Sequence, residues 1–287
     1  MRRAGLQPRT RAARGVRAWP GICLVLLGLL LAATAWAEIP ERPRLRIIGS
    51  SEGLPSTDIF GITRDHAGYV WIATGDGLAR YDGVDMRVWR HDPDDPGSLP
   101  GNLLYAVHVD HRDRVWLAGQ GSGLGVLDAD RRTFRSYRKD EYPQIGSDEV
   151  FTIASRGDEI WFGSYEGLHR LDAGGRITRF EHDPDDPESL PSNIVLAIAF
   201  DGRGTLWIAT MAGLARYDDG RITRVPLPGD HPSQSVLSVT PVDDGVWIGA
   251  TTGLLRIDGD GNLTRPPWAE RFRRPNAVVS LAQERDG

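Results

Sequence analysis

The chain has 287 residues, of which 40% are hydrophobic and 25% are charged, and its formal net charge is −5. This length is sufficient for a large hydrophobic core, and the negative charge argues against nucleic acid or an anionic membrane as a partner. Cys23 is the single cysteine, which excludes an intrachain disulfide, so the packing of the core must hold the fold together.

The first 37 residues have the pattern of a secretory signal peptide. A leader with six arginines and no acidic residue precedes the apolar run Ile22–Ala33, and Ala35-Trp36-Ala37 forms a small-x-small cleavage site. The run of about 12 apolar residues is shorter than the roughly 20 that a membrane-spanning helix needs, although a retained anchor is the alternative. We expect cleavage after Ala37, which leaves residues 38–287 as an exported domain with a net charge of −11.

One motif recurs five times along residues 38–287. It contains an apolar run around a tryptophan, such as Val70–Thr74, followed within a few residues by Gly-Leu-x-Arg, as in Gly77–Asp82. Successive tryptophans are 45, 45, 46 and 40 residues apart, so a structural unit of about that length is repeated. We expect each tryptophan to be a core residue rather than a platform for stacking sugars. They are Trp71, Trp116, Trp161, Trp207 and Trp247.

Each repeat is predicted to form four short antiparallel strands. The first is rich in β-formers, as in Asp58–Ile62, and the second is the tryptophan run, whose continuous apolar character suits a strand buried on both faces. The third is the Gly-Leu-x-Arg strand, and turns such as Asp82-Gly83 and Asp219-Gly220 supply the positive φ angles of a hairpin before the fourth. The fourth strands are expected at Met86–Arg90, Thr133–Tyr137, Ile177–Glu181 and Ile222–Val225.

Four-stranded units without helical periodicity predict an all-β protein with a β-propeller fold. A β-solenoid is the alternative, but its repeats are usually shorter and lack paired hairpin turns. The five predicted blades cover about residues 57–90, 103–137, 148–181, 193–225 and 235–265.

The end of the sequence predicts a partial sixth blade at residues 276–287. These residues align with residues 193–204, which would place a sixth tryptophan three positions after Gly287. Residues 44–48 resemble a fourth strand, which would close a complete ring by pairing with its last blade. We therefore expect an incomplete ring in a truncated product, which aggregates or stays partly open when expressed alone.

The repeat resembles the two-component regulator propeller repeat. Its pattern, Asp-x-x-Gly-x-Leu-Trp-Ile-Ala-Thr-x-x-Gly-Leu-x-Arg-Tyr-Asp, is matched best by residues 201–218 and nearly as well by residues 65–82. The other copies depart in part, since Asp113-Arg114 lacks the glycine and Gly157-Asp158-Glu159 is shortened. The resemblance implies the periplasmic sensory domain of a homodimeric protein anchored in the inner membrane. The implied output part is a histidine kinase of a two-component system or a diguanylate cyclase.

The loops between second and third strands are expected to lie on one face, together with the connections between blades. Propellers commonly bind ligands at the end of the central channel, where several loops meet. A small molecule, a saccharide or a periplasmic protein each fits as the signal, and ordinary solvated turns are the alternative. The candidate ligand-binding residues are Asp76, Gln120, Ser122, Tyr165, Glu166, Met211, Thr251 and Thr252.

Two inserts, His91–Pro100 and His182–Pro191, share the sequence His-Asp-Pro-Asp-Asp-Pro. Their carboxylates and imidazoles offer ligands for calcium, but Pro-Asp-Asp-Pro is strong turn chemistry, and we expect shared turn geometry. Asp258–Asn262 mimics the opening of an EF-hand loop. The twelfth position of an EF-hand loop is a glutamate that binds calcium, but here that position would be Ala269. We therefore expect a hairpin turn at residues 258–262.

The sequence contains no Gly-x-Ser-x-Gly elbow, phosphate-binding loop or Cys–His pairing. No histidine has an acidic partner at motif spacing, so we expect no catalytic residue, metal or cofactor in this chain. Two alternative functions stay open. One is a secreted propeller-fold enzyme such as a lyase, and the other is a purely protein-binding propeller.

Overall fold

The computed structural model describes residues 46–228, 234–272 and 277–281. The chain divides into two units, Met1–Ile47 and Ile48–Gly287. The predicted signal peptide lies outside the described residues, as do residues 276 and 282–287 of the predicted partial blade. Residues 46–48 and 277–281, the described parts of the predicted closing strand and sixth blade, form no strand. No helix of the described segments is long and apolar enough to cross a membrane.

The described residues of the second unit form five four-stranded antiparallel sheets, each with its strands in chain order, which confirms the all-β propeller prediction. Each sheet is one blade. The strands are β1 (Ile59–Arg64), β2 (Val70–Thr74), β3 (Gly77–Tyr81) and β4 (Met86–Trp89) in the first blade; β5 (Leu104–Val109), β6 (Val115–Gly119), β7 (Leu124–Leu127) and β8 (Phe134–Tyr137) in the second; β9 (Val150–Arg156), β10 (Glu159–Ser164), β11 (Gly167–Leu171) and β12 (Ile177–Phe180) in the third; β13 (Val195–Phe200), β14 (Leu206–Thr210), β15 (Gly213–Asp218) and β16 (Arg221–Val225) in the fourth; and β17 (Val236–Val242), β18 (Gly245–Ala250), β19 (Gly253–Asp258) and β20 (Leu263–Thr264) in the fifth.

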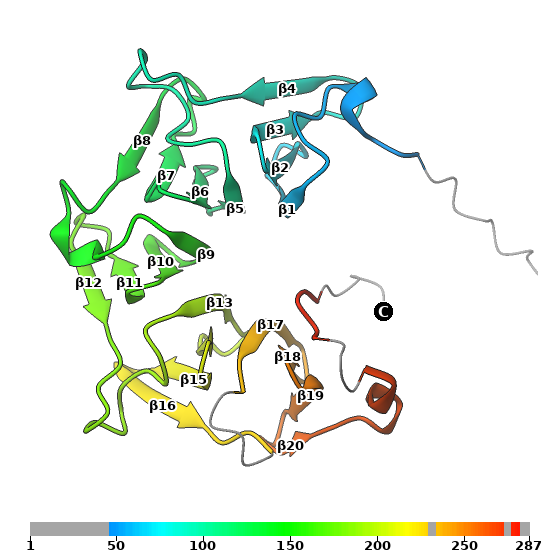
Figure 1. Ribbon diagram of the computed structural model, residues 1–287, viewed down its shortest axis with the longest axis vertical. Helices are drawn as coiled ribbons and strands as arrows, with labels where there is room; N and C mark the ends of the chain where they lie inside the picture. Colours follow the sequence, from blue (N-terminus) through cyan, green and yellow to red (C-terminus); the bar gives the residue numbers. More distant parts are fainter. Residues whose placement is uncertain (1–45, 229–233, 273–276, 282–287) are drawn as a thin grey trace, which may run out of the picture. The chain divides into compact units, whose positions relative to one another are not determined.

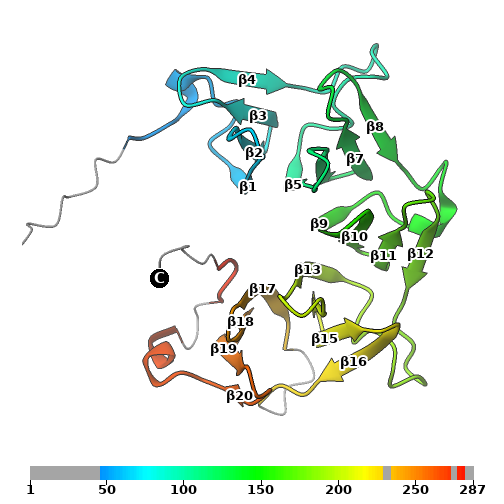
Figure 2. The same cartoon turned by 180° about the vertical axis from the view of Figure 1, so that it is seen from behind.

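Three short 3-10 helices complete the described structure: η1 (Ser50–Glu52), η2 (Pro143–Ile145) and η3 (Pro267–Phe272). The first strands of the blades, β1, β5, β9, β13 and β17, lie innermost and side by side in chain order (Figure 1). The fourth strands lie outermost, as the reverse view also shows (Figure 2).

The hydrophobic core lies between neighbouring blades. One cluster joins Trp71 of the first blade to Leu127 of the second, and the next joins Trp116 to Leu171 of the third. A second strand therefore packs against a neighbour on each face, and every residue of β6 and β14 is buried. This packing explains why the tryptophan runs are apolar at consecutive positions instead of alternating.

A single aspartate explains the spacing of Asp and Trp in the motif. Asp65 accepts the backbone N–H of Tyr69 through Oδ1 at 2.9 Å and the indole N–H of Trp71 through Oδ2 at 2.9 Å. It therefore fixes the turn between first and second strands and also satisfies a buried donor, which burial of an indole requires. Asp110 and Asp201 accept the indoles of their own blades in the same way, at 2.8 and 2.9 Å.

Trp161 and Trp247 lack this aspartate. Trp161 lies in β10, after the shortened third-blade turn, and its indole donates to Glu159 at 3.4 Å instead. In the fifth blade Pro241 stands six residues before Trp247, so the motif aspartate is absent. Trp71, Trp116, Trp161 and Trp207 are buried, whereas Trp247 is only partly buried. Trp247 is therefore less buried than the prediction of a core residue requires.

The predicted turns lie between third and fourth strands, but Asp82-Gly83 belongs to a four-residue loop in which only Gly83, of these two residues, has a positive φ angle, 103°. Asp219 and Gly220 have φ angles of 45° and 87° and connect β15 to β16 as a two-residue loop, the geometry of a tight hairpin. Residues 258–262 form the predicted hairpin turn between β19 and β20, in which Asp258 Oδ1 accepts the backbone N–H of Asp260 and Asn262. The observed fourth strands of the first four blades begin and end within one residue of their predicted bounds.

The two inserts share one turn geometry, as expected. His91 and His182 each donate their backbone N–H to an asparagine side chain, and each ring Nδ1 contacts a leucine carbonyl, at 2.8 and 2.6 Å. In both inserts a serine hydroxyl bonds to the backbone of the aspartate that follows the histidine. The repeated side chains of the inserts therefore close a turn.

Replacing Asp110 with asparagine is expected to lower the free energy of unfolding by about 2 kcal/mol. Burial raises the pKa of this carboxyl, but hydrogen bonds from Trp116 and Arg114 outweigh burial and hold the pKa below its ordinary value. One amide oxygen cannot accept both the indole and the turn N–H groups that Asp110 now accepts. Urea unfolding of both proteins measures the difference.

The matched control is Asp128→Asn in the same blade. Asp128 is 42% exposed and pairs with Arg135 at 3.1 Å, and surface pairs of this kind contribute less than about 1 kcal/mol. Equal losses for the two variants would contradict the role assigned to the buried carboxylate.

Candidate functional site

The loops between second and third strands and the connections between blades lie on one face, as predicted. We call this the loop face; its hairpin loops are residues 75–76, 120–123, 165–166, 211–212 and 251–252. Backbone hydrogen bonds join hairpins of this face to the connections between blades. Gly77 donates to Asn102 at 2.8 Å, Gly123 donates to Asp148 at 3.0 Å, and Met211 donates to Ile194 at 3.0 Å.

Most of the polar candidate residues already form ion pairs or hydrogen bonds with neighbours. Asp76 pairs with Arg90 at 3.1 Å, and Glu166 pairs with Arg179 at 3.0 Å. The hydroxyl of Thr252 accepts from Gln234 at 2.6 Å, and that of Thr251 donates to the carbonyl of Ser235 at 3.4 Å. These contacts stabilise the hairpins. They also use charged groups and hydroxyl groups that could otherwise bind a ligand.

The remaining candidates differ in accessibility. Gln120 is exposed, but Ser122 is only 3% exposed, so its hydroxyl is not presented to solvent as the ligand prediction requires. Tyr165 and Met211 are 47% and 44% exposed and are large hydrophobic side chains. No hydrogen bond or ion pair in the described residues joins one candidate to another. The residues share a face but do not form one connected cluster.

Sequence reasoning missed a set of residues at the inner rim of the loop face. In every first strand of the five described sheets the pairing with the second strand shifts by one residue, which is a β-bulge. The extra residue has no cross-strand partner, and bulges commonly re-aim a side chain next to a functional site. We call these residues the bulge collar: Phe60, Tyr105, Phe151, Leu196 and Leu237.

The collar is aromatic over the first three blades. The ring centroids of Phe60 and Tyr105 are 5.9 Å apart, and those of Tyr105 and Phe151 are 5.6 Å apart. Tyr165 continues the series at 4.8 Å from Phe151. Because Phe60 is 51% exposed and the other collar residues are partly buried, this series presents ring edges and faces at the surface.

The phenol of Tyr105 remains protonated over a wide pH range. Partial burial raises its pKa, and the negative charge of Glu149 raises it further. The collar thus carries a neutral hydroxyl beside its apolar rings. The sequence signal that would have found the collar is the large apolar residue that follows the first position of every inner strand.

Two exposed histidines connect neighbouring blades. His66 contacts Asp113 at 2.7 Å, and His111 contacts Asp158 at 3.1 Å. Each acid lies about one repeat after its histidine, so these pairs lie outside the motif spacing at which no acidic partner is expected. In the described parts of the chain no group of three or more His, Cys, Asp or Glu side chains is placed to hold a metal ion.

Comparison with known proteins supports the assignment of the repeat. Residues 53–76 and 189–212 match the family model described as two component regulator propeller. The curated protein Histidine kinase P4 from Formosa agariphila is 33% identical over 48 residues, which are 17% of this chain and 4% of that protein.

Solved structures show the same architecture. The extracellular domain of the putative hybrid two component system BT3049 from B. thetaiotaomicron is 25% identical with a TM-score of 0.64, over 76% of this chain and 31% of that chain. The corresponding domain of BT4673 is 21% identical with a TM-score of 0.61, over 76% and 28%. A streptogramin B lyase is 18% identical with a TM-score of 0.55, over 74% and 69%.

The last two similarities concern the fold alone. The chain spans less than a third of the two extracellular domains that it matches. Two segments of this chain therefore match the two component regulator propeller model, and the five blades of the described structure repeat the motif that these segments contain.

Proposed function

We propose that this chain is the extracytoplasmic signal-input domain of a membrane-anchored signalling protein. The observation that carries the proposal is the family match of its repeats, together with 25% identity to the extracellular domain of a putative hybrid two component system. The short similarity to Histidine kinase P4 favours a histidine kinase as the output over a diguanylate cyclase. The whole protein would act as a homodimer in the inner membrane.

We further propose that the signal binds at the loop face against the bulge collar and Tyr165. Three neighbouring blades contribute aromatic rings there, so a ligand lying across them would favour one relative arrangement of the blades. Aromatic rings with nearby hydroxyl groups suit a ligand with a flat apolar face and polar edges, and among the candidate signals a saccharide has this character. The lyase similarity concerns the fold, and no observation at this face favours catalysis.

Tyr165→Ala is expected to weaken saccharide binding by about tenfold or more, because it removes a half-exposed ring from the series. The measurement is titration calorimetry of the chain with oligosaccharides selected from a glycan array. Val84→Ala is the matched control, since Val84 is an exposed hydrophobic residue in the turn between β3 and β4.

Two results would contradict the proposal. If no oligosaccharide on the array bound, the saccharide assignment would be wrong. If a bound saccharide were equally sensitive to both variants, the site would lie away from the collar.

A further inference from the structure

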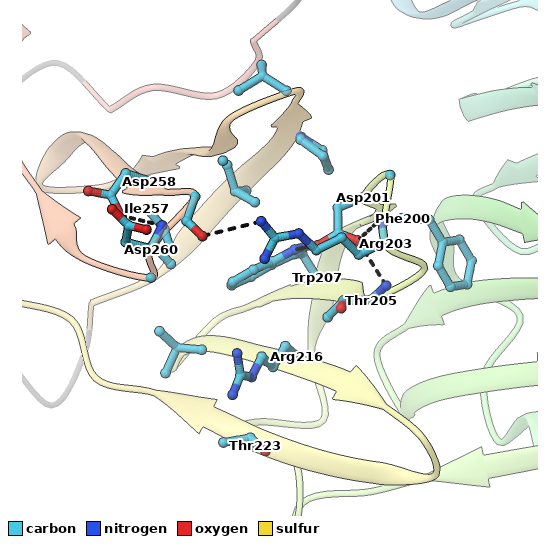
Figure 3. A pocket seen from close by; sticks show the side chains of 18 of the residues that line it. Phe200, Asp201, Arg203, Thr205, Trp207, Arg216, Thr223, Ile257, Asp258 and Asp260 are labelled. Atoms are coloured by element: carbon cyan, nitrogen blue, oxygen red, sulfur yellow. Dashed lines mark hydrogen bonds between the residues drawn. The ribbon is translucent and has the colours of Figure 1, made fainter.

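A cavity of about 760 Å³ lies between the fourth and fifth blades, at the ends of the strands opposite the loop face. It opens among the β13–β14 turn, the β17–β18 turn and the β19–β20 turn (Figure 3). Its apolar wall includes Trp207, Val225 and Val246. A cavity of this size can enclose a small ligand.

The cavity exists because this blade interface is filled less completely than the others. In the first three blades an aromatic residue of the fourth strand stacks on the tryptophan of its own blade: Trp89 on Trp71 at 5.3 Å, Tyr137 on Trp116 at 6.2 Å and Phe180 on Trp161 at 5.7 Å. The equivalent residue of the fourth blade is the smaller Val225, and β20 of the fifth blade has only two residues. The indole of Trp207 is therefore left at the wall of a cavity.

Arg216 lies in this cavity and differs from its equivalents in other blades. Arg80, Arg170 and Arg256 occupy the same motif position, and their guanidinium groups lie over their own tryptophans at 5.9, 5.7 and 5.4 Å. Arg170 and Arg256 also pair with acidic residues. Arg216 is exposed and has no hydrogen-bond or ion-pair partner among the residues that the structure describes.

A second guanidinium belongs to the same wall. Arg203 donates to the carbonyl of Gly259 at 3.3 Å across the mouth of the cavity, which uses one of its five N–H groups. Asp201 beside it already accepts the indole of Trp207 and the backbone N–H groups of Arg203 and Thr205. The fourth-blade wall therefore presents two arginines with spare donors (Figure 3).

The fifth-blade wall carries the opposite charge. Asp258 ends β19, Asp260 lies in the β19–β20 turn, and Asp243 lies in the β17–β18 turn. Hydrogen bonds from Asn262 hold the pKa of Asp258 below its ordinary value, so this carboxylate stays ionised. In the described residues no ion pair joins these aspartates to Arg203 or Arg216. The two walls face one another with their charges unneutralised.

We propose that this cavity binds a small zwitterion with an apolar body, namely a free amino acid or a short peptide. Its carboxylate would lie against Arg203 and Arg216, its ammonium group against Asp243 and Asp260, and its side chain against Trp207. A simple anion would meet the three aspartates, and a simple cation would meet the two arginines. A zwitterion matches both walls at once. This site is separate from the collar and does not depend on a ligand there.

Titration calorimetry of the chain with L-leucine and Leu-Leu tests the proposal. We expect binding of at least one of them, and at least tenfold weaker binding of N-acetyl-leucine and of leucinamide, each of which lacks one charge. Arg216→Gln and the double variant Asp243→Asn plus Asp260→Asn are each expected to weaken binding by at least tenfold. All three side chains are exposed, so folding should be retained, which thermal melting can verify.

Arg80→Gln is the matched control, because Arg80 holds the equivalent motif position over Trp71. It is expected to leave the affinity unchanged, as is Tyr165→Ala at the opposite face. The proposal is overturned if neither zwitterion binds at millimolar concentration, if the capped compounds bind as well as the zwitterions, or if Arg80→Gln has the same effect as Arg216→Gln.

Discussion

Replacing Trp161 with alanine is expected to lower the free energy of unfolding by about 4 kcal/mol. The indole is fully buried and lies between the third and fourth blades, with ring centroids of Phe180 at 5.7 Å and Tyr217 at 4.8 Å. The ring of Phe200 meets it edge-on at 6.2 Å. Its removal would leave a void that none of these neighbours can fill without breaking its own packing. Urea unfolding followed by circular dichroism measures the loss.

The other copies of the motif are the controls for this prediction. Trp207→Ala is expected to cost about 3 kcal/mol, because the indole is 6% exposed and already borders a cavity. Trp247→Ala is expected to cost about 1–2 kcal/mol, because that ring is only partly buried and its aromatic neighbour is Trp268 at 5.7 Å. Equal losses at all three positions would show that burial between blades does not determine the contribution.

The fold could be predicted from the sequence because its determinants are local and repeated. A tryptophan run every 40–46 residues marks the second strand of each blade, and Asp-Gly turns such as Asp219-Gly220 mark its hairpins. The hydrogen bond between Asp201 and the indole of Trp207 lies within six residues, so it appears in the sequence as a fixed spacing. These features require no knowledge of how neighbouring blades pack.

The candidate site was predicted less well, because it depends on pairing and on contacts between blades. Phe60 and Tyr105 stand at bulges, and a bulge is defined by the register of two strands. Ser122 was expected in the site because it lies in a hairpin loop, but the loop of residues 120–123 buries its side chain. The contact between His66 and Asp113 spans one whole repeat, so no local motif contains it.

The same reasoning applies to the cavity beside Trp207. A sequence comparison of repeats shows that Val225 replaces the aromatic residue that the first three blades have at this fourth-strand position, and that Arg216 keeps its motif position. It does not show that the smaller residue opens the interface, or that Arg216 loses the acidic partner found at Arg170. The volume of a cavity depends on how completely two neighbouring blades fill the space between them. It can therefore be determined only when the positions of both blades are known.

His169 should make the stability of this protein depend on pH between about 6.5 and 4. The imidazole is fully buried in β11 and stacks on Phe162 with ring centroids 4.7 Å apart. Neither ring nitrogen has a hydrogen-bond partner among the described residues. Burial lowers the pKa of His169 to about 4, and the positive charge of Arg179 lowers it in the same direction.

The sign of the effect follows from where the proton binds. In the unfolded chain an ordinary histidine has a pKa of about 6.5, so it takes up a proton between pH 6.5 and 4 while the folded protein does not. The contribution of His169 is therefore fully retained above pH 6.5 and is lost as the pH falls towards 4. The loss approaches about 3 kcal/mol, because each unit of pKa difference corresponds to about 1.4 kcal/mol.

His169→Leu is the variant that isolates this contribution, since leucine stands at the equivalent buried position of the fifth blade as Leu255. Carboxylates and the other histidines titrate alike in both proteins, so the difference between their unfolding free energies at each pH reports His169 alone. We expect that difference to grow in favour of the leucine variant from pH 7 to pH 4 and then to level off. Parallel profiles over this range would mean that the folded protein already protonates His169, and its assignment as a buried neutral ring would be wrong.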